Sequence, residues 1–172
     1  MRSVIDLAGW ARDHLAGWSA HPRSADITIE ASGDPIPVRV HPPLLGQLLD
    51  NLLDNACKYS QPGAPVVVRA SRSPSGVALL SVRDRGPGIA PEDRRHVFDA
   101  FFRSPLARGM GLPGVGLGLT IARRIATSLD AHIDALGPPE GGSEFVLSLA
   151  SERVEVGEVT AEAAGKLPTP NS

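Results

Sequence analysis

Residues 4–18 carry apolar side chains at steps of three and four positions, which is the period of an amphipathic helix. The pattern predicts a helix over this segment, with its apolar stripe packed into the core of the protein. The stripe consists of Val4, Leu7, Ala8, Ala11, Leu15 and Trp18.

Strand-like alternation of apolar and polar residues follows in ITIEA at 27–31 and IPVRV at 36–40. The SGDP sequence between them has the composition of a turn, so the pattern predicts a hairpin. A second hairpin is predicted from PVVVRA at 65–70 and VALLSVR at 77–83, which the turn-forming SRSPSG joins. AHIDAL and SEFVLSL are predicted to close the domain as strands on either side of GPPEGG.

Three further segments have helical character. Pro42 and Pro43 suit the first turn of a leucine-rich helix, because proline lacks the amide hydrogen that a helix start leaves unpaired. We expect this helix to end near Ser60. PEDRRHVFDAFF, residues 91–102, is predicted to be a short helix with acidic residues in its first turn. LTIARRIATSL, residues 119–129, is helical by its periodicity.

Together these elements predict an α/β (α+β) two-layer sandwich. Its sheet is mixed and mostly antiparallel, with about five strands, and its helices pack on one face. The length of 172 residues fits one domain, which we expect to span residues 1–150. Residues 151–172 are polar and lack an apolar period, so a disordered tail is expected there.

The composition changes this fold prediction little, but it limits which binding partners are expected. Lys and Arg number 17 against 19 Asp and Glu, so the net charge of -2 gives no electrostatic reason to expect nucleic acid or membrane contact. Cys57 is the only cysteine, which excludes an intrachain disulfide and fits a reducing cytoplasm. No run approaches the roughly 20 apolar residues that span a bilayer. The parent protein can still be membrane-anchored.

The leucine-rich helix carries a polar stripe beside its apolar one. Asn51, Asn55 and Lys58 recur there at helical spacing, whereas Asp50 and Asp54 point roughly opposite to the leucines. Solvated polar residues are one interpretation, although asparagine is a poor helix former. The other is a site for a divalent cation and phosphate, because an amide oxygen suits Mg²⁺ when the ligand supplies the negative charge.

Two glycine-rich stretches carry further candidate chemistry. DRGPG at 84–88 is either a tight turn or a pocket rim where the Asp84 carboxylate accepts a hydrogen bond from the exocyclic amine of adenine. GVGLGL at 114–119 opens a helix, and its backbone can approach a phosphate closely. GMGLPG at 109–114 matches the dinucleotide pattern G-x-G-x-x-G, but no βαβ unit encloses it.

The segment between these stretches, residues 103–114, is rich in glycine and is expected to be a mobile lid over a bound nucleotide. Arg103 can reach phosphate from this segment. Arg108 is either a second phosphate contact or a solvated side chain.

In this order the motifs resemble the ATP-binding catalytic domain of bacterial sensor histidine kinases. NLLDNACKY (51–59) looks like the asparagine box, DRGPG the first glycine box, FDAFFR (98–103) the phenylalanine box and GVGLGL the second glycine box. The resemblance covers about residues 4–150. It implies the Bergerat fold of gyrase, Hsp90 and MutL, with ATP and Mg²⁺ as cofactors.

The resemblance also implies roles for individual residues. Asn55 would hold Mg²⁺, Lys58 and Tyr59 would contact phosphates, and Asp84 would read adenine. The ATP-binding residues that it implies are Asn51, Asn55, Lys58, Tyr59, Asp84, Gly86, Gly88, Ile89, Phe101, Arg103, Gly114, Val115, Gly116, Leu117, Gly118, Leu119 and Ser143.

Sensor kinases phosphorylate a histidine on a separate dimerisation helix pair, and such a histidine is usually followed by an acidic residue and soon by proline. None of the five histidines here has that context; they are His14, His21, His41, His96 and His132. The implied partners are therefore the phosphoacceptor helical domain of a parent kinase and, indirectly, a response regulator. An anti-sigma-type serine kinase and a nucleotide-binding regulatory module without phosphotransfer remain as alternatives.

Overall fold

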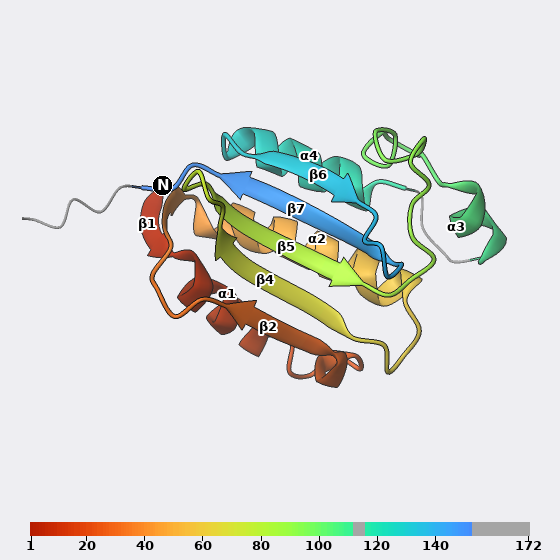
Figure 1. The fold of residues 1–172 in the computed structure, drawn as a ribbon, viewed down its shortest axis with the longest axis horizontal. Coiled ribbons are helices and arrows are strands. Elements are labelled where there is room, and N and C mark those ends of the chain that lie inside the picture. The colour runs from red at the N-terminus through yellow and green to blue at the C-terminus, as the bar shows by residue number, and fades with distance from the viewer. Residues whose placement is uncertain (112–115, 153–172) are drawn as a thin grey trace, which may run out of the picture.

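The computed structural model of the chain describes residues 1–111 and 116–152, and Figure 1 shows their fold. A five-stranded sheet runs through the molecule in the order β2-β4-β5-β7-β6. All neighbours in it are antiparallel except β2 and β4, which pair in parallel. The predicted mixed, mostly antiparallel sheet is confirmed. Its strands are β2 (Ile27–Ala31), β4 (Val66–Arg72), β5 (Ala78–Asp84), β6 (His132–Leu136) and β7 (Ser143–Leu149).

Three helices cover one face of this sheet, as predicted: α1 (Leu7–Ala16), α2 (Pro42–Tyr59) and α4 (Gly118–Ser128). In Figure 1 all three lie behind the strands. The central helix α2 packs against β4 and β5 and against α4, while α1 lies over β2 and β4. The short helix α3 (Pro105–Gly109) lies beyond one end of the sheet (Figure 1).

The core lies between α2 and the sheet. Five leucines of α2 are fully buried, because the leucine-rich stripe faces the apolar side of the strands. The buried face of β7 alternates strictly with its other face, as a strand with one covered side requires. Each buried leucine contributes on the order of 1.5–3 kcal/mol, so α2 is held firmly in place. The five are Leu45, Leu48, Leu49, Leu52 and Leu53.

The predicted helix over 4–18 is wrong at its first residues. A strand, β1 (Ser3–Asp6), precedes α1 and pairs antiparallel with β3 (Pro37–Val40) in a separate two-stranded sheet. Asp6 caps α1 by accepting from the Gly9 amide at 3.0 Å and also accepts from the Ile36 amide at 2.7 Å. Val4, predicted to lie in the core, is 48% exposed.

The hairpin predicted over 27–40 is also wrong. β2 pairs with β4 from Ile27 opposite Val66 to Ala31 opposite Ala70, while β3 belongs to the small sheet. The turn between the two segments therefore carries the chain from one sheet to the other. The second predicted hairpin, β4 with β5, is confirmed.

The phenylalanine-containing segment differs from its predicted helix. Residues 91–99 form successive turns, and the backbone at Phe101 is left-handed with φ 64. The regular helix in this region is instead α3, which Ser104 caps by accepting from the Ala107 amide at 3.2 Å. The predicted lid, residues 103–114, thus contains a short helix, and its residues 112–114 lie outside the described residues. At the other end, the Glu152 amide donates to Pro37 at 2.8 Å, and the predicted tail from 153 onward is also outside them.

Candidate functional site

A cavity of about 330 Å³ lies at the end of the sheet that carries α3. Its walls come from the second half of α2, the turn after β5, the segment leading into α3, and the start of α4. A volume of this size is typical of small-molecule sites. The lining residues are Asn51, Asp54, Asn55, Lys58, Tyr59, Asp84, Pro87, Gly88, Ile89, Val97, Phe102, Arg103, Ser104, Ala107, Gly116, Leu117, Gly118, Leu119, Ser143 and Phe145.

The polar stripe of α2 forms one wall of the cavity. Asn51, Asn55, Lys58 and Tyr59 all line it, so the stripe faces a pocket rather than bulk solvent. The Nδ2 atom of Asn51 is buried and has no hydrogen-bond partner among the described residues. A buried donor of this kind costs about 1–3 kcal/mol unless something accepts from it. The wall is therefore suited to a ligand that brings acceptors.

The two aspartates of α2 separate in the structure. Asp54 lines the cavity, and burial raises the pKa of its carboxyl, with the nearby Asp50 carboxylate adding to the effect. Asp50 instead turns toward α1, where its Oδ1 lies 2.7 Å from His14 Nε2 and accepts from Trp18 Nε1 at 2.8 Å. Helical spacing predicts that both residues point away from the leucines, but it carries no information that one of them reaches a pocket.

Asp84 is the last residue of β5, opposite Ser143 in the ladder with β7, and is only 2% exposed. Burial raises the pKa of its carboxyl, although hydrogen bonds from the amides of Gly86 and Ser143 oppose that rise. The Gly86 amide donates to Asp84 Oδ1 at 2.7 Å. A nearly buried carboxylate that lines a cavity is a strong acceptor for a ligand donor.

Two glycines bring the motifs into backbone contact. A Cβ on Gly86 would stand 2.6 Å from the carbonyl oxygen of Tyr59, so the turn after β5 lies directly against the end of α2. Gly116 has φ 75, and a Cβ there would stand 2.7 Å from the carbonyl oxygen of Phe102. Both positions exclude larger residues by close approach, and Gly116 does so also by its conformation.

Two cations line the same cavity. The pKa of the Lys58 ammonium is lowered by burial and by the neighbouring positive charge of Arg103. Arg103 Nη2 also donates a long hydrogen bond of 3.5 Å to Ala107, on α3. Two like charges held together against a pocket wall favour an anionic ligand that neutralises both.

Most predicted site residues meet in this cavity, but not all of them. Gly86 lies behind the lining and contacts Tyr59, and Phe101 is 68% exposed and lies outside the lining. Phe102 lines the cavity in place of Phe101, because the left-handed backbone at 101 turns that ring outward. Gly114 and Val115 lie outside the described residues. The lining residues that are not among the predicted site residues are Asp54, Pro87, Val97, Phe102, Ser104, Ala107 and Phe145.

The sequence that forms this cavity matches a known protein family. The family model "Histidine kinase-, DNA gyrase B-, and HSP90-like ATPase" matches residues 40–153, which include every lining residue of the cavity. The chain belongs to this ATPase family.

Individual relatives of this ATPase domain are sensor kinases. It is 40% identical over 130 residues to the signal transduction histidine-protein kinase/phosphatase MprB of Mycobacterium tuberculosis strain H37Rv, which covers 73% of the chain and 25% of MprB. It is 38% identical over 130 residues to the sensor protein QseC of Salmonella typhimurium, covering 75% of the chain and 27% of QseC. The chain thus spans about a quarter of the length of these curated relatives.

Solved structures agree with the sequence relatives. The mycobacterial sensor histidine kinase MprB superposes with a TM-score of 0.72 at 30% identity, covering 88% of this chain and 98% of that one. Full-length ShkA in complex with AMPPNP superposes with a TM-score of 0.71 at 27% identity, covering 87% of this chain and 31% of that one. The ATPase domain is therefore homologous to the catalytic domains of sensor histidine kinases, and the predicted fold and family resemblance are confirmed.

The residues of this ATPase domain fit magnesium only together with a polyanion. Within the described residues, no group of three or more His, Cys, Asp or Glu side chains is arranged to hold a metal ion. The wall that carries the Asn55 amide also carries Lys58, and Arg103 lies close enough to affect the Lys58 pKa. Mg²⁺ is hard and needs oxygen ligands, which the phosphates of a nucleotide supply alongside one amide oxygen.

Within the described part of the ATPase domain, no helix combines the length and the apolar character that a bilayer span requires.

Proposed function

We propose that this domain binds Mg-ATP in the cavity and transfers the γ-phosphoryl group to a histidine on a separate dimerisation and phosphoacceptor domain. A response regulator would then receive the group in a two-component system. The observation that carries the proposal is the meeting of Asn55, Asp84 and Gly116 in one cavity, although they come from three separate motifs. The proposal assigns these roles to residues 1–150 and implies a cytoplasmic site of action, where ATP is available.

The adenine end of the site is assigned to Asp84. Its carboxylate can accept a hydrogen bond from the exocyclic amine of adenine, whereas guanine presents a carbonyl oxygen at that position and would be repelled. Ser143, which is 7% exposed and lies opposite Asp84 in the ladder, is assigned to the same end. Because Asp84 is rigidly held by the Gly86 amide, its orientation costs little on binding.

The phosphate end is assigned to the start of α4 and to the two cations. α4 begins at Gly118 without a side-chain cap, so the amide hydrogens of its first turn are available to an anion. Gly116, with its positive φ, lets the backbone approach the phosphates without a side chain between them. Lys58 and Arg103, which both line the cavity, would neutralise the remaining charge.

Magnesium is assigned to Asn55. Its amide oxygen would complete the coordination of an ion that enters with the triphosphate, and the bound ion would supply charge neutralisation on the phosphates. Asn51, one turn earlier, has a buried Nδ2 that can donate to a phosphate oxygen or to a water bound in the site.

The chain's own contribution to transfer is positioning and charge neutralisation, which phosphoryl transfer chiefly requires. The bond between the γ-phosphorus and the bridging oxygen breaks and leaves ADP, while a bond forms between that phosphorus and an imidazole nitrogen of the acceptor. The imidazole then loses its proton to a base on the acceptor domain. None of the chain's five histidines lines the cavity, which supports an acceptor outside these residues.

The test is a transfer assay with the full chain, Mg-ATP labelled in the γ-phosphate, and a dimeric acceptor-helix domain from a sensor histidine kinase. We expect acid-labile phosphohistidine on the acceptor domain. Acid-stable phosphoserine would instead support a serine kinase, and ATP binding without transfer to any acceptor would support a regulatory module. Either result overturns the proposal.

A further inference from the structure

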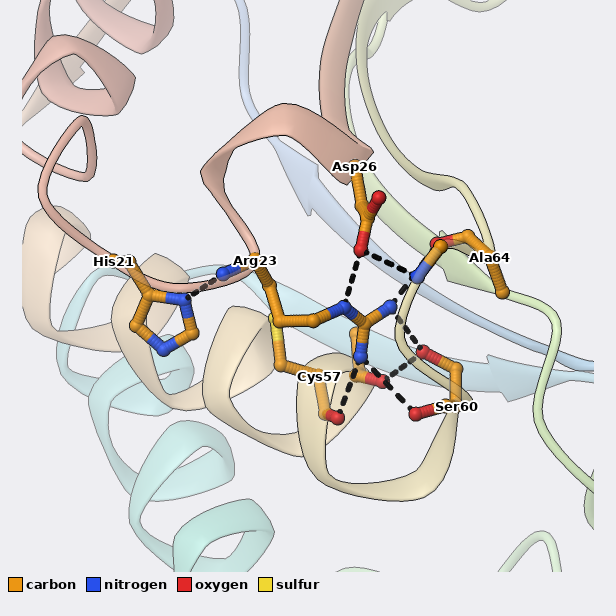
Figure 2. A network of polar contacts seen from close by, with 8 residues as sticks. His21, Arg23, Asp26, Cys57, Ser60 and Ala64 are labelled. Atoms are coloured by element: carbon orange, nitrogen blue, oxygen red, sulfur yellow. Dashed lines mark hydrogen bonds and ion pairs between the residues drawn. The ribbon is translucent and has the colours of Figure 1, made fainter.

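Arg23 is a buried arginine that lies outside the cavity, in the loop between α1 and β2. It is 7% exposed, and its guanidinium points at the carboxyl end of α2 (Figure 2). Nε donates to Asp26 Oδ2 at 2.5 Å. Nη1 donates to the carbonyl oxygens of Cys57 at 2.9 Å and Ser60 at 3.1 Å. Nη2 donates to Ser60 Oγ at 3.1 Å and to the Ala64 carbonyl at 3.0 Å.

The bond to Cys57 satisfies one of the carbonyls that the end of α2 leaves without a partner, and the bonds to Ser60 and Ala64 hold the chain that follows the helix. The last four carbonyls of any helix lack intrahelical donors, and a cation there also interacts favourably with the negative end of the helix dipole. Ser60, the residue after α2, is already extended with φ -107 and ψ 153, so the helix cannot continue to supply those donors. Arg23 therefore donates to the Cys57 carbonyl in place of the amide that a further helical turn would supply.

The partner of Arg23 extends the same clamp to the following turn. Asp26 Oδ2 accepts from the Gly63 amide at 3.0 Å as well as from Arg23. The pKa of the Asp26 carboxyl is lowered by the hydrogen bond from Arg23 and then by that from Gly63, so it remains charged at neutral pH. The pair thus joins the loop before β2 to the whole path of the chain from 57 to 64.

Two residues inside this clamped path line the cavity: Lys58 and Tyr59. The Cys57 carbonyl that Arg23 binds belongs to the same peptide group as the Lys58 amide. On the far side of the pair, the Tyr59 carbonyl lies against Gly86, and Arg23 binds the next carbonyl, that of Ser60. The peptide before Lys58 is therefore held from outside the helix by Arg23, and the peptide after Tyr59 lies against Gly86.

Fold stability alone is a weak explanation for such a group. Burying an arginine incurs a desolvation cost that often equals or exceeds the attraction to its partner, here the partly exposed Asp26, so well-packed apolar residues serve stability as well or better. What the planar, five-donor fork of arginine adds is a fixed geometry for several acceptors at once, which lysine cannot reproduce.

We propose that Arg23 is a positioning residue for the triphosphate: it fixes the last turn of α2 so that Lys58 and Tyr59 stand where the phosphates bind. This inference rests on the proposed nucleotide function. It assigns Arg23 no contact with the ligand and no effect on the adenine end, because Asp84 and Ser143 are held by β5 and β7.

The test compares two ligands on the full chain. Binding of Mg-ATP is measured by calorimetry and binding of adenosine by NMR titration, for the parent and for Arg23→Gln and Arg23→Lys. We expect Arg23→Gln to weaken Mg-ATP about tenfold while adenosine affinity changes less than about twofold, since tenfold corresponds to the loss of one favourable contact. Arg23→Lys should fall between parent and Arg23→Gln, because it keeps the charge without the fork.

A double-mutant cycle with Lys58→Ala shows through which residue Arg23 acts. If Arg23 works by placing Lys58, the losses in Mg-ATP affinity from Arg23→Gln and Lys58→Ala will not add in the double variant. Additive losses, or an equal loss of adenosine and Mg-ATP affinity, would overturn the inference and leave Arg23 as a general structural residue.

Val40→Ala serves as a control for stability. Val40 is 1% exposed and lies in β3, whose partner β1 is at the opposite end of the molecule from α3 (Figure 1). This variant should lower the unfolding temperature and leave the ratio of the two affinities unchanged. Should Arg23→Gln not fold, Asp26→Asn must show the same selective loss of Mg-ATP affinity for the inference to stand.

The outcomes for the two proposals are distinct. If the parent chain binds no Mg-ATP, or if Lys58→Ala leaves Mg-ATP affinity unchanged, the proposed nucleotide site is wrong, irrespective of Arg23. If the parent binds and Lys58→Ala weakens binding but Arg23→Gln does not, only the inference about Arg23 fails.

Discussion

The carbonyl oxygen of Tyr59 occupies the space that a side chain on Gly86 would need, only 2.6 Å from the position of its Cβ. This contact joins the end of α2, which carries Lys58, to the turn that follows Asp84. The two halves of the proposed nucleotide site are therefore in backbone contact. Their spacing requires that position 86 carry no side chain.

Gly86→Ala is expected to separate these two halves. The added methyl must push back a backbone carbonyl, so we expect a loss of about 1–3 kcal/mol in the free energy of unfolding and weaker Mg-ATP binding. Urea denaturation and calorimetry measure the two effects. Gly33→Ala is the matched control, because nothing lies within 4 Å of a Cβ at that position, and it should leave both quantities nearly unchanged. Equal behaviour of the two variants would contradict the close approach.

Asp84→Asn is expected to weaken ATP binding about 10- to 100-fold, since a hydrogen bond to a charged group contributes about 1.5–3 kcal/mol. The domain should remain folded, because an amide oxygen can still accept from the Gly86 amide. Asp34→Asn, in the exposed turn before β3, is the control. Unchanged ATP affinity in the Asp84 variant would remove this residue from the site.

The stability difference between the parent and Asp84→Asn should also depend on pH in a defined direction. Burial raises the pKa of Asp84 above its unfolded value, so its ionisation costs stability as pH rises through the folded pKa. The parent should therefore be less stable than Asp84→Asn at pH 7, and the difference should shrink below the unfolded pKa of about 3.9. Chemical denaturation of both proteins across this range measures it; a difference independent of pH would show that the carboxyl pays no such penalty.

Asn55→Ala is expected to suppress the magnesium dependence of ATP binding. The proposed site has one amide oxygen for the ion, so its loss should lower the gain in ATP affinity on adding Mg²⁺ by about tenfold, the lower end of the range for losing a residue that supports a metal site. Calorimetry with ATP in the presence and absence of Mg²⁺ gives that gain. Gln47→Ala, on the exposed side of the same helix, controls for helix stability. A gain that survives Asn55→Ala would count against the ligand role.

Asp50→Ala is expected to lower the stability of the domain without changing its affinity for Mg-ATP. Asp50 joins α2 to α1 through His14 and Trp18, and losing these partly exposed hydrogen bonds should cost about 1–2 kcal/mol of stability. Mg-ATP affinity should not change, because Asp50 does not line the cavity. Tryptophan fluorescence during urea denaturation follows the first effect and calorimetry the second. A clear loss of ATP affinity would mean that the α1 contact supports the pocket.

The pattern of the sequence predicted α2 and its polar stripe well, because both depend on local periodicity. Asn51, Asn55 and Lys58 share one side of a long helix whose leucines fix its rotation about its axis, so their common direction follows from spacing. The same holds for the β4 and β5 hairpin, whose partners are neighbours in the chain.

Strand partners far apart in the sequence could not be read in this way. Alternation identified β2 and β3 as strands, but it carries no information on whether they pair with each other or with β4 and β1. Val4 fits the helical stripe by spacing, yet the Asp6 side chain caps a helix that begins only afterwards. At Phe101 the backbone is left-handed and the ring is exposed, while Phe102 lines the cavity, and no periodic pattern predicts this.

Arg23 shows a different limit. A single basic residue in a loop has no spacing to interpret, and its role becomes visible only when the acceptors around it, from 57 to 64, are brought together by the fold.

The parallel pairing of β2 with β4 has a consequence for the order in which the chain acquires its properties. β4, β5, β6 and β7 are joined to one another by antiparallel pairing. β2 instead pairs in parallel with β4 at the edge of the sheet, and we expect it to do so only after α2 has packed against the sheet. Asp26 immediately precedes β2, so the arginine clamp closes only when that edge strand docks. In a refolding experiment we therefore expect nucleotide affinity to recover later than the leucine core forms. A chain interrupted during synthesis before β4 would contain every residue of the clamp but would lack the strand with which β2 pairs.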